Sequence, residues 1–287
     1  MTVSYHARHT TRYTYEDPVS QCQTEIRLRP REDRRQQVRD WRLKVEPSPA
    51  RIEQRLDYFG NGVVSFVVLE PHDRLTITTS SDVSITAPHQ LLPEVTCAWE
   101  EARGILAAPA DPVTLQASEF RWESPFAPWA EELRVYARQV FTPGRPLAEA
   151  ARELTHRIYV EFDYAPKSTS IETPLAEVVR TRKGVCQDFA HVMIGALRTL
   201  GLSARYVSGY LKSGTQYTGA EASHAWVSVF VPGTGWVDFD PTNDLVPDTG
   251  HVTLAWGRDY ADVTPVKGVT TGGGEQTVEV EVRVAPI

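Results

Sequence analysis

The feature that most constrains the fold of this 287-residue chain is a cysteine placed directly before an apolar helical segment. Gly184 is typical of a helix end, and the apolar run at residues 189–200 predicts a second helix that starts beside Cys186. Unpaired amides and the positive end of the helix dipole favour a thiolate there, and the thiolate is the nucleophilic form. The pattern favours a reactive Cys186, with a buried, inert cysteine as the alternative.

Two more polar residues flank a predicted β-hairpin. His224 begins the strand-like residues 224–231, and Asp240 follows strand-like residues 236–239, with a turn signal between them. Antiparallel pairing would bring His224 and Asp240 together, so that the carboxylate fixes the imidazole tautomer and the other ring nitrogen faces Cys186. Asp238 faces the same side of its strand, so periodicity does not choose between the two aspartates. The alternatives are a packing histidine and a simple Asp–Pro turn.

We expect two folded units joined by a helical segment. Residues 1–87 alternate strand-like stretches with turn signals, which is typical of a small β-sandwich. Residues 88–150 are predicted to be a helical connecting segment, and residues 151–287 a unit of helices and strands that holds all three polar residues. Helices are expected at residues 131–141, 147–160, 175–184 and 186–201, and strands at 24–28, 41–45, 63–69, 75–85, 204–211, 224–231, 236–239 and 278–284.

Composition narrows the function classes. Lysine and arginine total 30 against 37 acidic residues, and this negative balance argues against nucleic-acid binding. The arginines crowded between residues 27 and 42 favour solvated strand faces, with an anionic partner as the alternative. Three scattered cysteines do not form a disulfide framework, and no secretory segment or run of roughly 20 apolar residues is present. We therefore expect a cytoplasmic protein that does not bind membranes.

The sequence does not favour metal or cofactor chemistry. His191 lies about 140° around the predicted helix from Cys186, so the two cannot easily share a ligand. Zinc-binding spacings are absent, and the acidic residues 240–248 lack the glycine and closing glutamate of a calcium loop. No glycine-rich phosphate loop precedes a helix. We expect no metal and no cofactor.

Three ordered motifs make the chain resemble the transglutaminase-like superfamily, and in particular the bacterial transglutaminase-like cysteine proteinases. These motifs are GVCQDFAH at residues 184–191, SHAWV at 223–227 and GWVDFDPTN at 235–243. A later segment, GRDYADV at 257–263, and the N-terminal β-region also look like parts of this family. The likeness covers nearly the whole chain.

The resemblance implies a papain-like α+β core, in which a helix bearing the cysteine packs on an antiparallel sheet, preceded by a β accessory domain. It implies Cys186 as nucleophile, His224 as general base and acid, and Asp240 rather than Asp238 as the orienting carboxylate. The start of the helix would direct the backbone amide of Cys186 into the site as one oxyanion donor. Tyr164 and Gln187 are candidates for the second donor, although a solvent-facing role is the alternative for Gln187.

The implied activity is acyl transfer on peptide or carboxamide bonds through a thioester, by a peptidase or amidase. The alternatives are a transglutaminase and a non-enzymatic interaction module on a peptidase-like fold. The expected partner is a protein or peptide substrate, and the sequence does not specify an oligomeric state.

Overall fold

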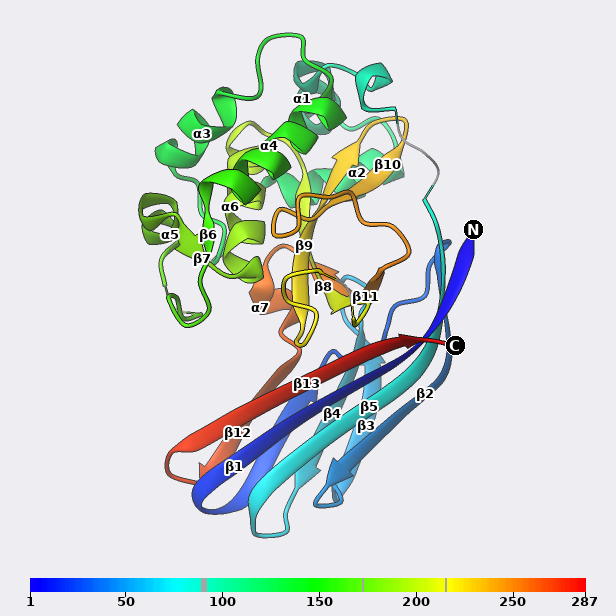
Figure 1. The fold of residues 1–287 in the computed structure, drawn as a ribbon, viewed down its shortest axis with the longest axis vertical. Coiled ribbons are helices and arrows are strands. Elements are labelled where there is room, and N and C mark those ends of the chain that lie inside the picture. The colour runs from blue at the N-terminus through cyan, green and yellow to red at the C-terminus, as the bar shows by residue number, and fades with distance from the viewer. Residues whose placement is uncertain (89–91, 172, 215) are drawn as a thin grey trace.

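The computed structural model describes residues 1–88, 92–171, 173–214 and 216–287. Figure 1 shows a large antiparallel sheet beside a half in which helices surround a smaller sheet. The predicted α+β fold with an N-terminal β unit is confirmed. None of the described helices is both long enough and apolar enough to cross a membrane.

The large sheet is organised around its first strand. Its strands are β1 (Thr2–Ile26), β2 (Gln36–Glu46), β3 (Arg51–Leu56), β4 (Gly62–Val68), β5 (His72–Thr86), β12 (Val266–Gly272) and β13 (Gln276–Pro286). The first part of β1 pairs with β5 and β13, and its last part pairs with β4 and β12. Strands β2 and β3 lie beyond β5 and β4. Buried and exposed residues alternate along much of β1, which gives the sheet one apolar face.

Side chains from both parts of this sheet pack in one apolar core, as expected for a small β-sandwich, and β1 belongs to both parts. The position of the last two strands, however, corrects an expectation. The C-terminal strands β12 and β13 pair with β1, so residues 266–286 belong to the N-terminal sheet and not to the unit that begins at residue 151. The division at residues 87 and 150 stays a prediction.

The smaller sheet has the order β10-β9-β8-β11 and is antiparallel throughout. Its strands are β8 (Ala204–Leu211), β9 (His224–Val231), β10 (Gly235–Phe239) and β11 (His251–Gly257). The predicted hairpin is present, because β9 and β10 pair about the turn at residues 232–235. Strand β11 is an element that the sequence did not predict.

Helices pack around this smaller sheet (Figure 1). They are α1 (Trp99–Ala107), α2 (Pro112–Ser118), α3 (Glu131–Arg138), α4 (Leu147–Glu161), α5 (Leu175–Thr181), α6 (Cys186–Thr199) and α7 (Tyr260–Val263). Helix α6 packs against β8 and β9 on one side and against α3, α4 and α5 on others. It is buried along nearly its whole length, as expected for a helix that is apolar on most faces.

The two halves meet at a stack of arginine and tryptophan side chains. The Arg31 guanidinium lies 3.4 Å from the ring centroid of Trp256 on β11, and the Arg205 guanidinium lies 3.8 Å from the same ring. Asn61, which is fully buried, accepts a hydrogen bond from the backbone N–H of Trp256 and donates one to its carbonyl. At least one of the crowded N-terminal arginines is therefore a structural contact and not a solvated side chain.

Glycine at position 209 is required for the smaller sheet to pack. A Cβ at Gly209 would lie 2.1 Å from the carbonyl oxygen of Val252 and 2.4 Å from the Trp226 ring. We expect Gly209→Ala to lower the free energy of unfolding by about 1–3 kcal/mol, as overpacked cores do. Gly104→Ala on α1 is the control, since nothing lies within 4 Å there and alanine favours a helix by about 0.5–1 kcal/mol. Urea unfolding measures both, and equal effects would contradict the steric argument.

Candidate active site

The chain before α6 is fixed so that Cys186 begins the helix. The short parallel pair β6 (Asp163–Tyr164) and β7 (Lys183–Gly184) precedes it. The carboxylate of Asp188 accepts hydrogen bonds from the Val185 N–H at 2.8 Å and from the Thr169 hydroxyl at 2.7 Å. A Cβ at Gly184 would lie 2.7 Å from that carboxylate oxygen, so only glycine allows the close approach. Cys186 therefore lies in the first turn of a buried helix, as the sequence predicted.

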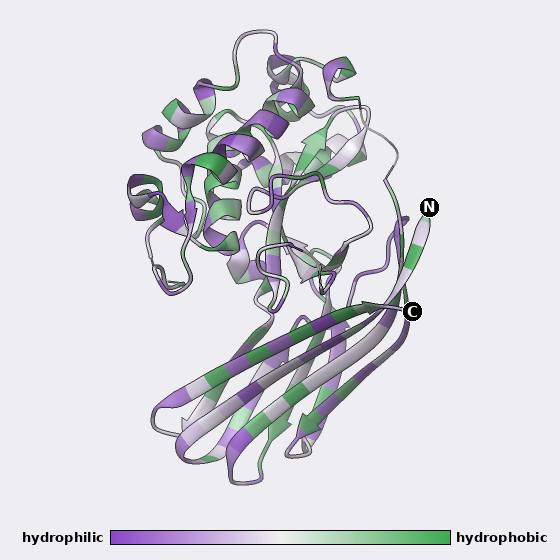
Figure 2. Ribbon diagram, viewed as in Figure 1, coloured by the Kyte–Doolittle hydropathy of each residue, from purple (hydrophilic) through white to green (hydrophobic). Residues whose placement is uncertain are grey.

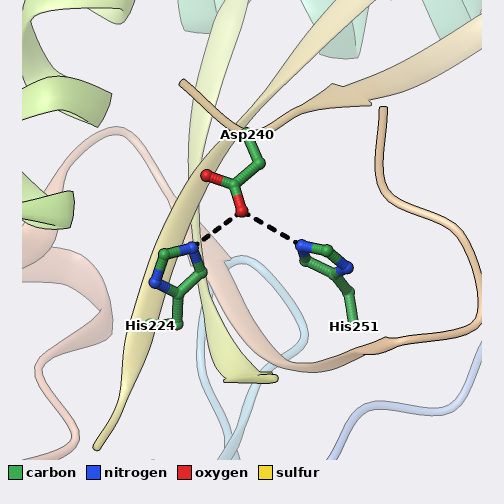
Figure 3. Close-up of side chains that lie close together, drawn as sticks. All are labelled: His224, Asp240 and His251. Carbon is green, nitrogen blue, oxygen red and sulfur yellow. Dashed lines mark hydrogen bonds and ion pairs between the residues drawn. The ribbon is translucent and has the colours of Figure 1, made fainter. Parts of the chain in front are cut away.

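The structure joins His224 to Asp240. The Nε2–H of His224 donates to Oδ2 of Asp240 at 2.9 Å, and neither side chain is exposed to solvent (Figure 3). His224 is the first residue of β9, and Asp240 directly follows β10, so the pairing of these strands brings the two together. Asp238 is half-buried, and its charge partly offsets the effect of burial, which lowers the pKa of Arg205. The ambiguity between the two aspartates is thus resolved by contact.

Asp240 accepts more than the one hydrogen bond that the sequence suggested. Its Oδ1 accepts from the backbone N–H groups of Thr242 at 2.9 Å and Asn243 at 3.3 Å. Its Oδ2 also accepts from the Asn243 side-chain amide at 2.9 Å and from Nε2 of His251 at 3.2 Å. Figure 3 shows the carboxylate between the two imidazole rings. Five donors therefore hold one buried carboxylate.

His251 and the amide of Asn243 are site residues that sequence reasoning missed. Asn243 ended a recognised motif, and its distance of three residues from Asp240 could have indicated a turn contact. His251 carried no such signal, because it begins β11, which pairs with β8 and not with the predicted hairpin. Its approach to Asp240 depends on the order of the four strands.

The charges of this cluster are strongly coupled. Burial by itself would lower the pKa of His224, but the charge and hydrogen bond of Asp240, together with Cys186, raise the pKa to about 10. Burial would likewise raise the pKa of Asp240, yet His224 and His251 hold it well below its usual range. At neutral pH the pair is therefore an imidazolium and a carboxylate.

Cys186 and His224 line one cleft of about 410 Å³. The Nδ1 atom of His224, the ring nitrogen that Asp240 does not use, is buried and has no hydrogen-bond partner of standard geometry among the described residues. The walls come from both halves of the molecule: Tyr164, Gln187 and Ser223 on one side, and Thr11, Tyr13, Val278 and Val280 of the large sheet on the other. The arrangement presents a thiol and an imidazole to the same space.

Both oxyanion candidates line this cleft. Burial, and secondarily the charge of Cys186, raises the pKa of Tyr164 to about 12, so its phenol stays a hydrogen-bond donor at neutral pH. A Cβ at Gly219 would lie 3.8 Å from the Tyr164 hydroxyl and 2.9 Å from Nδ1 of His224. The phenol and the imidazole thus border the same glycine. Gln187 lies in the first turn of α6, directly after the cysteine.

His224, Asp240 and His251 also offer three ligand atoms within 4.8 Å of one another, which is a spacing that fits a metal ion. In this structure, however, both Nε2 atoms donate to the same carboxylate oxygen. A cation at this position would have to displace both of those protons, since a metal binds the neutral, deprotonated ring nitrogen. The observed geometry is that of a hydrogen-bonded charge cluster.

Comparisons with known proteins agree with the architecture. Residues 5–84 match the model of the bacterial transglutaminase-like N-terminal region, and residues 134–241 match that of the transglutaminase-like superfamily. A solved structure of a candidate cysteine protease from Cytophaga hutchinsonii superposes with a TM-score of 0.78 at 22% identity, and covers 100% of this chain and 91% of its own. That likeness shows the fold.

Relatives in sequence are also found. An uncharacterised protein of Mycobacterium tuberculosis is 39% identical over 295 residues, which cover 98% of this chain and 92% of the relative. A protein-glutamine gamma-glutamyltransferase of Pseudomonas aeruginosa is 30% identical over 125 residues, or 42% of this chain and 18% of that protein. The near-complete mycobacterial match and the two family models show that this chain belongs to the transglutaminase-like superfamily.

Proposed function

We propose that this protein is a cysteine-dependent enzyme that transfers acyl groups from peptide or carboxamide bonds through a thioester on Cys186. The single observation that carries the proposal is the fully buried His224–Asp240 pair beside Cys186. His224 and Cys186 line the same cleft, and Nδ1 of His224 is not used by Asp240. A histidine oriented by a carboxylate beside a nucleophile is the arrangement that activates thiols and hydroxyls. Cys186, His224 and Asp240 are the proposed catalytic residues.

In the proposed reaction, the thiolate of Cys186, stabilised by the His224 imidazolium beside it, attacks the substrate carbonyl carbon. The electron pair of the carbonyl moves onto oxygen and returns as the C–N bond breaks, while the imidazolium gives its proton to the departing amine. The neutral His224 then deprotonates a water molecule, which attacks the thioester, releases the acid and restores the thiolate and the imidazolium. Asp240 keeps the imidazole in one tautomer and stabilises its charged form throughout.

The developing oxyanion needs donors close to Cys186. The first amides of a helix have no partner within the helix, so the N–H of Cys186 is one candidate. The phenol of Tyr164 is the proposed second donor, because it remains protonated and borders the same glycine as His224. Gln187 is the weaker candidate of the two, since among the described residues none makes a hydrogen bond that fixes its side-chain amide.

We favour hydrolysis over transfer to an amine because the cleft is accessible to water. Tyr164 is 38% exposed, and Val278 and Val280 on the opposite wall are 50% and 42% exposed. The second candidate function is transglutaminase activity, which the partial likeness to the Pseudomonas enzyme supports. Incubation with glutamine-containing peptides, with and without a primary amine, followed by mass spectrometry, separates cleavage, deamidation and crosslinking.

Our first functional prediction concerns the reactivity of the three free cysteines. Iodoacetamide at neutral pH is expected to alkylate Cys186 much faster than Cys22 or Cys97, because Cys186 shares a cleft with the His224 imidazole. His224→Ala should slow this labelling, and Cys186→Ala should abolish turnover without lowering the melting temperature by more than a few degrees. Mass spectrometry of labelled peptides gives the rates. Labelling of Cys186 at the rate of Cys22 would favour a non-enzymatic interaction module.

The second prediction concerns pH. Asp240 raises the pKa of His224, so the imidazolium that protonates the leaving amine should persist until about pH 10, and turnover should fall above that pH. In Asp240→Asn the raising charge is lost, and the alkaline limb of kcat/KM should move to lower pH. The rate itself should fall by roughly 10²- to 10⁴-fold, as when a triad carboxylate is replaced. An unmoved alkaline limb would assign it to another group.

The third prediction concerns His251 as a positioning residue. His251→Phe removes one donor from Asp240 and should lower kcat by about tenfold, because charged hydrogen bonds in buried sites are strong. His251→Gln can still donate and should restore much of the rate, whereas a purely steric role would not distinguish the two variants. Steady-state kinetics, with melting temperatures as the control for folding, measure the difference.

A further inference from the structure

The outer edge of β13 is only partly occupied by the protein itself. One side of β13 pairs with β1 along its whole length. On its other side, the Val282 N–H donates to the Glu221 carbonyl at 3.1 Å, and the Val284 carbonyl accepts from the Ser213 N–H at 3.0 Å. The segment before β9 therefore covers the C-terminal part of this edge, and Figure 1 shows it reaching down to β13.

The rest of the edge exposes unpaired backbone groups at known positions. In an antiparallel strand, residues whose N–H and C=O face one neighbour alternate with residues that face the other. Val282 and Val284 face away from β1, while Glu275 faces it, because its carbonyl accepts from the Glu16 N–H at 2.9 Å. Even-numbered residues of β13 therefore face away from β1, and odd-numbered residues face it. The backbone N–H and C=O groups of Val278 and Val280 thus point away from β1. Among the described residues, none pairs with these groups.

This free edge borders the candidate active site. The side chains of Val278 and Val280 line the cleft that Cys186 and His224 also line. Hydrophobic and hydrophilic residues alternate from Val278 to Val284 (Figure 2), so these valines share one face of the strand: Val278 and Val280 line the cleft, and Val282 and Val284 are buried in the core of the large sheet. Unpaired strand edges are templates for another extended chain, and natural proteins usually block them. Here the chain blocks one part of the edge and leaves open the part beside the cleft.

We propose that the edge of β13 at Val278 and Val280 binds an extended segment of the polypeptide substrate by adding it as a further strand. Four backbone groups of β13 would hold the segment, and alternate substrate side chains would lie over the cleft face, where Val278 and Val280 favour apolar groups. The proposal rests on the proposed function and adds to it a substrate class: an unfolded or locally extended polypeptide, and not a small amide.

One experiment removes a donor from the edge. Val280→Pro deletes an N–H that faces away from β1, a place where a strand tolerates proline. We expect kcat/KM for a ten-residue peptide with one glutamine to fall by about fivefold to tenfold, as for the loss of one hydrogen bond. Thr270→Pro on β12 is the matched control. Thr270 pairs with Cys22 of β1 and does not line the cleft, and its N–H also faces away from β1, since the Pro265 carbonyl, of opposite parity, accepts from the Arg27 N–H of the chain after β1. The control should keep the activity of the unmodified protein.

The second experiment leaves the protein unchanged. Copies of the same peptide, each N-methylated at one residue, are tested for acylation of Cys186 by mass spectrometry. Strand addition predicts that methylation weakens acylation at every second residue, where the N–H faces β13, and has little effect between these positions. This alternation does not depend on whether Val280→Pro folds normally.

The outcomes separate this inference from the proposed function. A flat methylation profile, or equal activity of Val280→Pro and Thr270→Pro, with normal acylation of Cys186, would overturn the edge site and leave the proposed function intact. Failure of every peptide and of p-nitrophenyl acetate to acylate Cys186 would overturn the proposed function, and the inference with it.

Discussion

The site depends on the burial of one charge, the carboxylate of Asp240. A fully buried carboxylate without partners would cost several kcal/mol, and the group would protonate instead. Five donors prevent this: one from β9, one from β11, and three from the turn after β10, where two backbone N–H groups and the Asn243 side chain donate. The folding of three separate segments is thereby tied to the ionisation of a single side chain. The same charge keeps His224 protonated well into alkaline pH.

The packing of the smaller sheet allows these three segments to meet at Asp240. Gly209 on β8 lies opposite His224, and the absence of a side chain there leaves room for the Trp226 ring. The large sheet then closes the cleft from the other side, and the Arg31–Trp256–Arg205 stack and the Asn61 hydrogen bonds join the two halves beside β11. The N-terminal sheet is therefore part of the cleft and not a separate appendage.

The sequence predicted the elements whose signals are local. Helix α6, the β9–β10 hairpin and the contact between His224 and Asp240 follow from periodicity, turn residues and the geometry of a two-strand pair. The motifs then identified the family. Strand β1 was recognised only at its end, since polar residues interrupt its alternation and its pairing partners are far away in the sequence.

What the sequence could not predict are contacts set by strand order. His251 reaches Asp240 only because β11 lies beside β8, and Val280 reaches the cleft only because β13 returns to pair with β1. The alternation at residues 278–284 correctly indicated a strand, but a period of two does not say which sheet the strand joins. Along the sequence, the candidate active-site residues lie between β1 and β13 of the large sheet, so β13 completes a cleft wall that β1 begins. Cys186 and His224 come from the middle of the chain, whereas the surface opposite them comes from its two ends.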